Sequence, residues 1–269
     1  MSAKVFSVHQ FKGGCGKTTL TTNLAAAIYR TFGKRVAIID ADPQTNAPLT
    51  FGLRTKADVG LLDVMLKDIP VESIRHSVHD DSTGCLHIYN GGEKLSSFES
   101  EVANKEEYEP TEKYLLFLKK VISPIKEAYD FIFIDTAPSI GLLNQSIFLA
   151  SNKILIPMAP ESYSTDGMLS ILRLFDELKE YNDEVELGGV VFTKVQRNIR
   201  DHQNIMKEME EYLDYKGVKR YQTELPQTTI FQRSVNEDAT CLFLNQKLNK
   251  KDQKFILLFR SLAGEVIHE

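Results

Sequence analysis

A glycine-rich segment near the N-terminus constrains the fold more than any other feature of this sequence. It reads HQFKGGCGKTTL from His9 to Leu20 and follows a short, largely apolar run, Lys4–His9. Glycines let the backbone turn sharply and point successive N–H groups at one anion. Because a helical pattern begins near Thr18, the positive end of that helix faces the same anion. The order of strand, glycine turn and helix therefore predicts a phosphate-binding loop.

The loop departs from the pattern G-x-x-x-x-G-K-[ST] at its first position, which holds Phe11, and Lys12 follows. Lys17 matches the lysine that reaches the β- and γ-phosphates of a nucleotide, and Thr18 matches the hydroxyl ligand of Mg²⁺. A lysine beside the phosphates can neutralise charge that develops on them, so we predict a catalytic role for Lys12 as well as Lys17. The remaining predicted phosphate contacts are Gly13, Gly14, Cys15 through its backbone N–H, Gly16 and Thr19.

Carboxylates stand at the ends of two further apolar runs. Asp40 ends RVAIID, Asp42 follows before Pro43, and Asp135 ends DFIFID. In open α/β sheets, ligand groups gather beyond the carboxyl ends of the strands. We therefore expect Asp42 to orient an attacking water, and Asp40 and Asp135 to support Mg²⁺.

Short apolar runs alternate with helical patterns along the whole chain, which predicts an α/β fold with a doubly wound, mostly parallel sheet flanked by helices, in one domain over residues 1–269. The expected strands are Lys4–His9, Arg35–Asp40, Leu86–Asn90, Asp130–Asp135, Lys153–Met158, Leu187–Thr193 and Tyr221–Leu225. The expected helices are Thr18–Thr31, Glu112–Ala128 with a bend at Pro124, Asp166–Tyr181, Asp201–Tyr215 and Asp252–Ile267. The acidic stretch Ser96–Lys113 is expected to be a solvated helix or loop.

The amino-acid composition limits where the protein is expected to reside and how it could bind nucleic acid. The net charge of the 269 residues is -5, so nucleic acid could be bound only through a local basic patch. Three widely spaced cysteines fit a reducing compartment rather than a disulfide framework. The N-terminus has no signal-peptide pattern, and no apolar run approaches the roughly 20 residues of a membrane-spanning helix. We therefore expect a cytoplasmic protein.

With these motifs in place, the sequence resembles the deviant Walker A ATPases of the ParA/MinD group, and most of all short Soj-like ParA partition proteins. The first expected strand starts near Lys4, which leaves no room for an N-terminal DNA-binding extension. The matching stretches are Lys12–Thr19, Asp40–Asn46, Phe131–Ser139 and Ala159–Met168.

The resemblance implies roles for several residues. Lys12 would cross to the nucleotide of a second subunit in an ATP-bound sandwich homodimer, and the first P-loop glycine would be dispensable. Asp42 would be the hydrolytic switch, and Asp135 would hold the metal. The adenine would lie near Thr193–Lys194 and Pro226–Gln227. The expected cofactors are ATP and Mg²⁺, and turnover would be slow until an adaptor protein, ParB-like or other, stimulates it.

The resemblance also implies that the dimer binds DNA without sequence preference and positions a cargo over the nucleoid. That cargo could be a plasmid, a chromosome origin or a protein assembly such as a carboxysome. Close ParA proteins carry a basic residue where this chain has Ile230, so Arg233 is a substitute. The candidate DNA contacts are Arg197, Arg200, Arg233, Lys247, Lys250, Lys251 and Lys254.

Three other functions remain as alternatives. A MinD-like membrane switch would need an amphipathic C-terminal helix in the lipid interface, whereas KFILLFRSLAGEVIHE ends in an acid and better fits a helix packed on the domain. An iron–sulfur protein would need cysteine ligands, but Cys85 has no cysteine partner. A nucleotide-binding module without turnover is disfavoured by Asp42. The six histidines show no metal-binding spacing, and we expect surface or packing roles for them.

Overall fold

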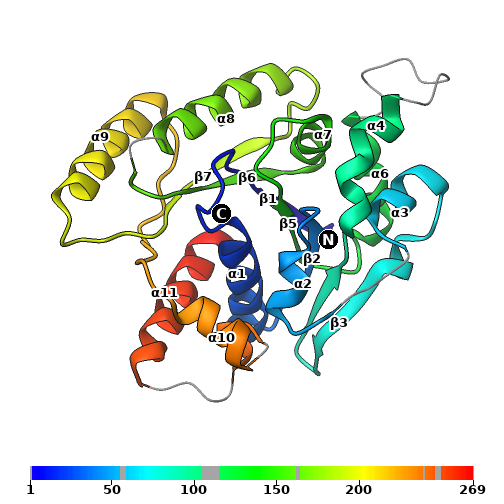
Figure 1. Ribbon diagram of the computed structural model, residues 1–269, viewed down its shortest axis with the longest axis horizontal. Coiled ribbons are helices and arrows are strands. Elements are labelled where there is room, and N and C mark those ends of the chain that lie inside the picture. The colour runs from blue at the N-terminus through cyan, green and yellow to red at the C-terminus, as the bar shows by residue number, and fades with distance from the viewer. Residues whose placement is uncertain are drawn as a thin grey trace.

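The computed structural model describes residues 2–54, 59–103, 115–161, 164–238, 240–245 and 250–268. Within them, seven strands form one sheet in the order β3-β4-β2-β5-β1-β6-β7 (Figure 1). All neighbouring strands are parallel except β3 and β4, which are antiparallel. This confirms the predicted doubly wound, mostly parallel sheet. The strands are β1 (Lys4–Val8), β2 (Arg35–Ala41), β3 (Arg75–Asp80), β4 (Cys85–Tyr89), β5 (Phe131–Thr136), β6 (Lys153–Met158) and β7 (Glu186–Phe192).

Helices cover both faces of the sheet (Figure 1). Alternate side chains of β1 and β5 enter different cores: Phe6 and Phe133 pack with α1 and α11, whereas Val5 and Ile132 pack with α6 and α7. Every residue of β5 is buried, as expected for a strand that is covered on both faces. The helices are α1 (Lys17–Phe32), α2 (Asn46–Thr50), α3 (Leu61–Lys67), α4 (Phe98–Ala103), α6 (Phe117–Ile122), α7 (Leu142–Ala150), α8 (Ser164–Leu178), α9 (Arg200–Lys216), α10 (Ile230–Asp238) and α11 (Lys250–Ile267).

The order of the strands places the phosphate loop at the centre of the sheet. β1 lies between β5 and β6, and α1 leaves from its carboxyl end. In the pairing of β2 with β5, Asp40 lies directly opposite Asp135. The two carboxylates predicted from separate strand ends are therefore neighbours in space.

Two predicted elements differ from the structure. Residues 221–225 run beside β7 with hydrogen bonds from Tyr221 N to Val190 O and from Leu225 N to Phe192 O, but they form no continuous strand. The reason is that the amides between these positions, at Gln222 and Thr223, donate instead to the carboxylate of Glu265. Within the described part of the predicted helix Glu112–Ala128, the helix is interrupted by a turn at Leu116, continues as α6, Phe117–Ile122, and passes into a 3-10 turn, Ser123–Ile125, that contains Pro124.

Strand β3 and the short helices α2, α3, α7 and α10 were not predicted. β3 is an edge strand whose residues are exposed or half-buried, so it lacks the apolar run that reveals the central strands. Part of the acidic stretch Ser96–Lys113 forms α4, which buries Phe98 and Val102, and residues 104–113 lie outside the described residues. No helix in the described part of the chain is both long enough and apolar enough to cross a membrane.

Candidate functional site

The phosphate loop has the backbone conformation that its glycines predict. Gly14 and Gly16 adopt φ angles of 74° and 92°, in the left-handed region that favours glycine, and Gly16 begins α1. Phe11 is not among the non-glycine residues with positive φ in the described chain. Its side chain instead packs against the core beneath α8 and α9. The first glycine of the ordinary pattern is therefore unnecessary here, because the backbone does not need glycine at that position.

Lys17 lies inside the loop, at the start of α1. Its side chain is buried, and its ammonium donates to the carbonyl of Gln10, with Nζ 2.9 Å from the oxygen. The hydroxyl of Thr21, on α1, donates to Asp135 Oδ1 at 3.3 Å, and the neighbouring Thr18 hydroxyl acts to lower the pKa of the same carboxyl. The loop and the end of β5 are thus joined through side chains that also suit phosphate and metal binding.

Asp40 and Asp135 form a buried pair of carboxylates, each with no solvent exposure. Burial together with the neighbouring carboxylates raises the pKa of Asp135 to about 7 and the pKa of Asp40 well above its usual range. One oxygen of each, Oδ2, has no hydrogen-bond partner within the described residues. Unsatisfied carboxylate oxygens next to the Thr18 hydroxyl are the oxygen donors that Mg²⁺ prefers, so these residues fit a magnesium ion.

Asp42 lies one step beyond Asp40 and is fixed by the local backbone. Its Oδ1 accepts a hydrogen bond from Gln44 N at 2.9 Å, and its own N–H donates to Asp40 Oδ1 at 3.3 Å. The residue lines the cavity above the phosphate loop. The predicted water-orienting carboxylate therefore lies on the wall of the same cavity as Lys17 and Thr18.

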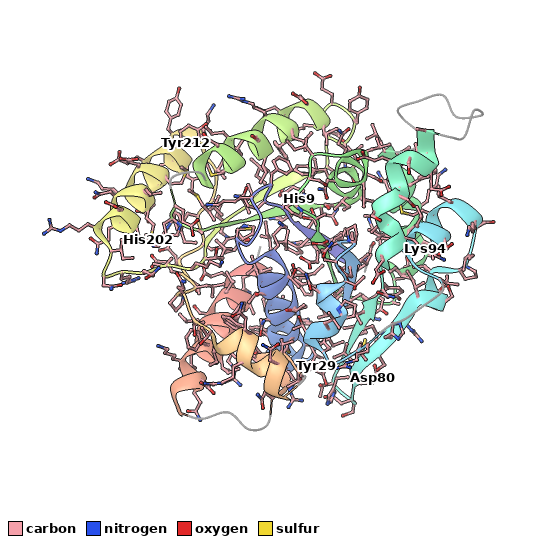
Figure 2. All side chains as sticks on the ribbon, viewed as in Figure 1. His9, Tyr29, Asp80, Lys94, His202 and Tyr212 are labelled. Carbon is pink, nitrogen blue, oxygen red and sulfur yellow. The ribbon has the colours of Figure 1, made fainter. Side chains whose placement is uncertain are left out.

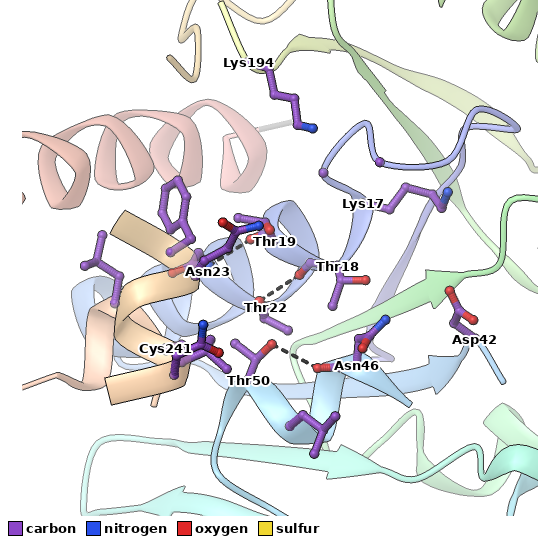
Figure 3. A pocket seen from close by; sticks show the side chains of 18 of the residues that line it. Lys17, Thr18, Thr19, Thr22, Asn23, Asp42, Asn46, Thr50, Lys194 and Cys241 are labelled. Carbon is purple, nitrogen blue, oxygen red and sulfur yellow. Dashed lines mark hydrogen bonds between the residues drawn. The ribbon is translucent and has the colours of Figure 1, made fainter. Parts of the chain in front are cut away.

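A cavity of about 580 Å³ opens above the loop (Figure 3). It is lined by loop glycines, Lys17, Thr18 and Thr19 from the start of α1, Asn46 from α2, and Phe231 from α10. Lys194 enters from the segment after β7, and a β-carbon on Gly14 would lie 3.9 Å from its Nζ. Lys194 has a φ of 53°, which is strained for a residue with a side chain. The fold thus holds a third cation beside the loop, in addition to Lys12 and Lys17.

The structure places the residues predicted to contact adenine at different locations. Thr193 is buried, and its hydroxyl donates to Cys15 O at 2.8 Å, so it supports the loop rather than lining the cavity. Gln227 lines an adjoining cavity of about 700 Å³ that shares Lys194 and Gln232 with the first. Pro226 lines a different hollow with Thr223 and Leu258. Of Thr193, Pro226 and Gln227, the last is in the best position to contact a base.

Lys12 is not among the residues that line the cavity above the loop in this structure. It forms an ion pair with Glu161, which follows β6, and its Nζ lies 2.5 Å from Oε2. The hydrogen bond from Lys12 lowers the pKa of Glu161. Both side chains are partly exposed, so the pair can exchange partners at low cost.

The predicted DNA contacts fall into three groups. Arg197 pairs with Glu224, and Arg233 pairs with Asp252. Arg200 is exposed at the start of α9 and makes no ion pair among the described residues. Lys254 is exposed and lies over the ring of Phe255. Lys247 and the side chains of Lys250 and Lys251 lie outside the described residues.

Two residues at the site were not predicted to act there. The amide of Asn23 donates to Thr19 O at 2.9 Å, and its buried Oδ1 has no partner among the described residues. Asn23 follows Thr19 by four positions, so helical periodicity could have placed it on the cavity face of α1. Asn46 reaches the cavity only through the tertiary fold. The ammonium of Lys194 also reaches the phosphate loop only through the tertiary fold, because the sequence analysis placed Lys194 near the adenine.

Comparisons with known proteins agree with this geometry. The family model of an AAA domain matches residues 3–187. The sporulation initiation inhibitor protein Soj of Bacillus subtilis is 30% identical over 226 residues, which cover 83% of this chain and 84% of Soj.

Two solved structures share the fold. The ATP complex of an McdA variant from Cyanothece superposes with a TM-score of 0.79 at 17% identity, covering 98% of this chain and 95% of that one. Cobyrinic acid a,c-diamide synthase of Mycobacterium smegmatis with a bound ATP analogue and magnesium superposes with a TM-score of 0.78 at 19% identity, covering 97% and 93%.

Proposed function

The chain belongs to the ParA/MinD family of P-loop ATPases, and on this premise we propose that it hydrolyses ATP with Mg²⁺ in a cycle of dimerisation that positions a cargo. The observation that carries the proposal is the arrangement of Lys17, Thr18 and Asp42 around one cavity, with the buried Asp40–Asp135 pair at the neighbouring strand ends. Structural relatives that hold an ATP analogue with magnesium support the choice of cofactor.

In this proposal the chain's own groups prepare the triphosphate for attack. The N–H groups of the loop and the start of α1 bind the phosphate oxygens, and Lys17 exchanges the Gln10 carbonyl for the β- and γ-phosphates. Thr18, Asp40 and Asp135 would hold Mg²⁺, which when bound neutralises charge on the phosphate oxygens. Asp42 orients the attacking water and accepts its hydrogen bond.

The proposal assigns Lys12 to the partner's nucleotide in a homodimer. Lys12 makes its present ion pair at the surface, so it can leave Glu161 for a phosphate of higher charge. Two exposed apolar side chains, Leu49 and Ile140, belong to segments next to the carboxyl ends of β2 and β5. Burial of such side chains against a second subunit would contribute favourable free energy to dimerisation.

We propose further that the dimer binds DNA without sequence preference through local basic residues, associates with the nucleoid in the cytoplasm, and turns ATP over slowly until an adaptor, ParB-like or other, stimulates it. The structure favours this over a MinD-like membrane switch, because α11 buries Phe259, Leu262 and Val266 against α1. The apolar face of the terminal helix is therefore already used within the domain.

Substitution of two residues tests the cycle. With Mg²⁺ and a non-hydrolysable ATP analogue, light scattering should show a dimer for the unmodified protein and a monomer for Lys12→Ala, with hydrolysis at least about 100-fold slower because a charge-stabilising group is lost. Lys119→Ala, an exposed lysine of α6, is the matched control. Asp42→Ala should leave ATP bound and the dimer persistent. A dimer of Lys12→Ala with normal turnover would disprove the role of Lys12.

A further inference from the structure

A second cluster of metal-ligating side chains lies on the β3–β4 pair. It contains an aspartate, a cysteine and a histidine, Asp80, Cys85 and His87, whose ligand atoms all lie within 4.8 Å of one another. We propose that these three residues bind one divalent transition-metal ion, with Zn²⁺ as the preferred ion. The proposal departs from the sequence-based expectation that the histidines have surface or packing roles.

The strand pairing explains how the three side chains meet. Cys85 and His87 are two apart on β4 and therefore share a face, and Asp80 lies directly opposite Cys85 on β3. A register shift between Ser77 and His79 inserts one residue into β3. Without this bulge Asp80 would point to the other face of the sheet, so the bulge aims it at the cysteine and the histidine.

Groups behind the cluster hold His87 ready to act as a ligand. His87 Nε2 lies 2.8 Å from Asp80 Oδ1, while Nδ1 lies 2.7 Å from the hydroxyl of Tyr129, which lies 2.9 Å from the hydroxyl of Tyr89. Both tyrosines are buried. A metal-bound histidine usually gives its second N–H to an oxygen of this kind, which fixes the ring and the tautomer. On the metal side, Ser77 donates to the other oxygen of Asp80.

The ligand set selects the class of metal. One nitrogen, one sulfur and one oxygen suit Zn²⁺ and its neighbours, whereas Mg²⁺ prefers oxygen alone. Bond lengths of about 2.0–2.3 Å in a tetrahedron require ligand atoms ~3.5 Å apart, so binding calls for small side-chain rotations, and the 54% exposed side chain of Asp80 is free to make its own. Burial raises the pKa of the Cys85 thiol, so the ion would displace the thiol proton on binding and leave one position open for water.

The site is distinct from the phosphate loop. Cys85 begins β4, whereas the phosphate loop and the Asp40–Asp135 pair lie at the carboxyl ends of the parallel strands. Figure 2 shows Asp80 at the outer end of β3, well away from His9, which directly precedes the loop. A metal here would bind whether or not the protein hydrolyses ATP.

Titration of the full-length, EDTA-stripped protein with Co²⁺ and then Zn²⁺, without nucleotide, tests the proposal. We expect one Co²⁺ per chain with a thiolate-to-cobalt charge-transfer band, and displacement of the ion by Zn²⁺. Cys85→Ser should remove the band, and Asp80→Asn and His87→Gln should weaken Zn²⁺ binding more than about 100-fold. Tyr129→Phe should weaken it about 10- to 100-fold through His87.

Control variants distinguish loss of the metal site from an unspecific effect or from misfolding. His76 lies on β3, the strand that carries Asp80, but it is not part of the cluster. His76→Gln should therefore leave the Zn²⁺ affinity unchanged. Because Asp80 is exposed, Asp80→Asn should fold normally, which circular dichroism would verify. Absence of the charge-transfer band in the unmodified protein, or a Zn²⁺ affinity that none of the four site variants lowers, would overturn the proposal.

Discussion

At the scale of single residues, the site gathers buried polar groups that a stable core would avoid. His9 is fully buried at the end of β1, and its ring packs on Phe148 with centroids 4.2 Å apart. Neither ring nitrogen has a hydrogen-bond partner among the described residues. Such groups cost stability, and their concentration next to the phosphate loop is typical of a functional site.

His9 should make the protein sensitive to acid. Burial, with Lys17 nearby, lowers the pKa of His9 from 6.5 to about 3, so below pH 6.5 the unfolded chain takes up a proton that the folded protein does not. The contribution of His9 to stability should therefore fall by about 1.4 kcal/mol per pH unit, which is about 2 kcal/mol at pH 5. Asp40 and Asp135 contribute with the opposite sign, because their raised pKa values let the folded protein take up protons that the unfolded chain does not. Urea unfolding of the unmodified protein and of His9→Gln at pH 7 and pH 5 isolates the contribution of His9 as the difference between the two pH dependences. The same pH dependence in His9→Gln as in the unmodified protein would contradict the assignment, and His76→Gln serves as the control.

The buried carboxylate pair that suits metal binding should also lower the stability of the fold when no metal is bound. Without metal, Asp40 and Asp135 repel each other, so Asp135→Asn should raise the melting temperature in EDTA at pH 8 by at least about 2 °C while lowering ATP hydrolysis at least about 100-fold. Asp176→Asn, which changes an exposed aspartate of α8 outside the site, should not stabilise the protein. A lower melting temperature for Asp135→Asn in calorimetry would show that the pair is not strained.

At the scale of elements, α1 connects the site with the core. Its first turn carries Lys17 and Thr18, and its later turns are buried from Leu20 to Tyr29 against the sheet and α11. α1 ends at Gly33, whose φ of 61° and N–H bond to Tyr29 O form a left-handed cap. The position of the phosphate loop therefore depends on how well α11 covers α1.

Truncation of Phe259 tests the packing of α11. Phe259 has no solvent exposure and lies edge-on to Phe231 and Phe243, so Phe259→Ala should cost about 3–5 kcal/mol of unfolding free energy. Leu257→Ala, on the same helix but 62% exposed, should change it by less than about 0.5 kcal/mol. Urea titration compares the two. Equal effects, or ATP-dependent liposome binding that Leu257→Ala abolishes, would favour the membrane alternative.

At the scale of the whole molecule, the net charge is negative, so the proposed DNA binding must use a local basic patch. β3 and β7 are opposite edges of the sheet, and the candidate Arg200 follows β7 at the start of α9. The N-terminus of α9 has no side-chain cap, so its amides can also face a phosphate. Arg197 and Arg233 already have carboxylate partners and Lys254 lies over the ring of Phe255, which makes Arg200 the clearest candidate among the described residues.

Arg200→Ala should weaken binding of the ATP dimer to DNA of any sequence. Two phosphate contacts would be lost per dimer, so the slope of log K against log salt should become less steep by about 2. Fluorescence anisotropy with a duplex of arbitrary sequence, from low to physiological salt, measures this slope. Arg75→Ala, at the β3 edge, should leave it unchanged. An identical slope for Arg200→Ala would remove α9 from the DNA interface.

The sequence by itself determined the features whose signals are local. The glycines, Lys17 and Thr18 of the loop were readable because backbone turns and helix starts depend on adjacent residues, and the apolar strands were readable because a sheet covered on both faces needs unbroken apolar runs. Asp42 and Asp135 were predicted for the same reason, as carboxylates at or just beyond the ends of such runs, whereas Lys12 was predicted from its place in the loop and from the family resemblance.

Only the tertiary structure decided the features that depend on long-range pairing. The opposition of Asp40 and Asp135 depends on strand register, the approach of Lys194 to Gly14 on a loop after β7, and the ion pair of Lys12 on Glu161, 149 residues away. The sequence did not reveal edge strand β3 or the Asp80–Cys85–His87 cluster. A bulge sets which side chains share a face, and no residue pattern predicts that bulge. Proximity across a sheet is a property of its pairing, and no local pattern encodes it.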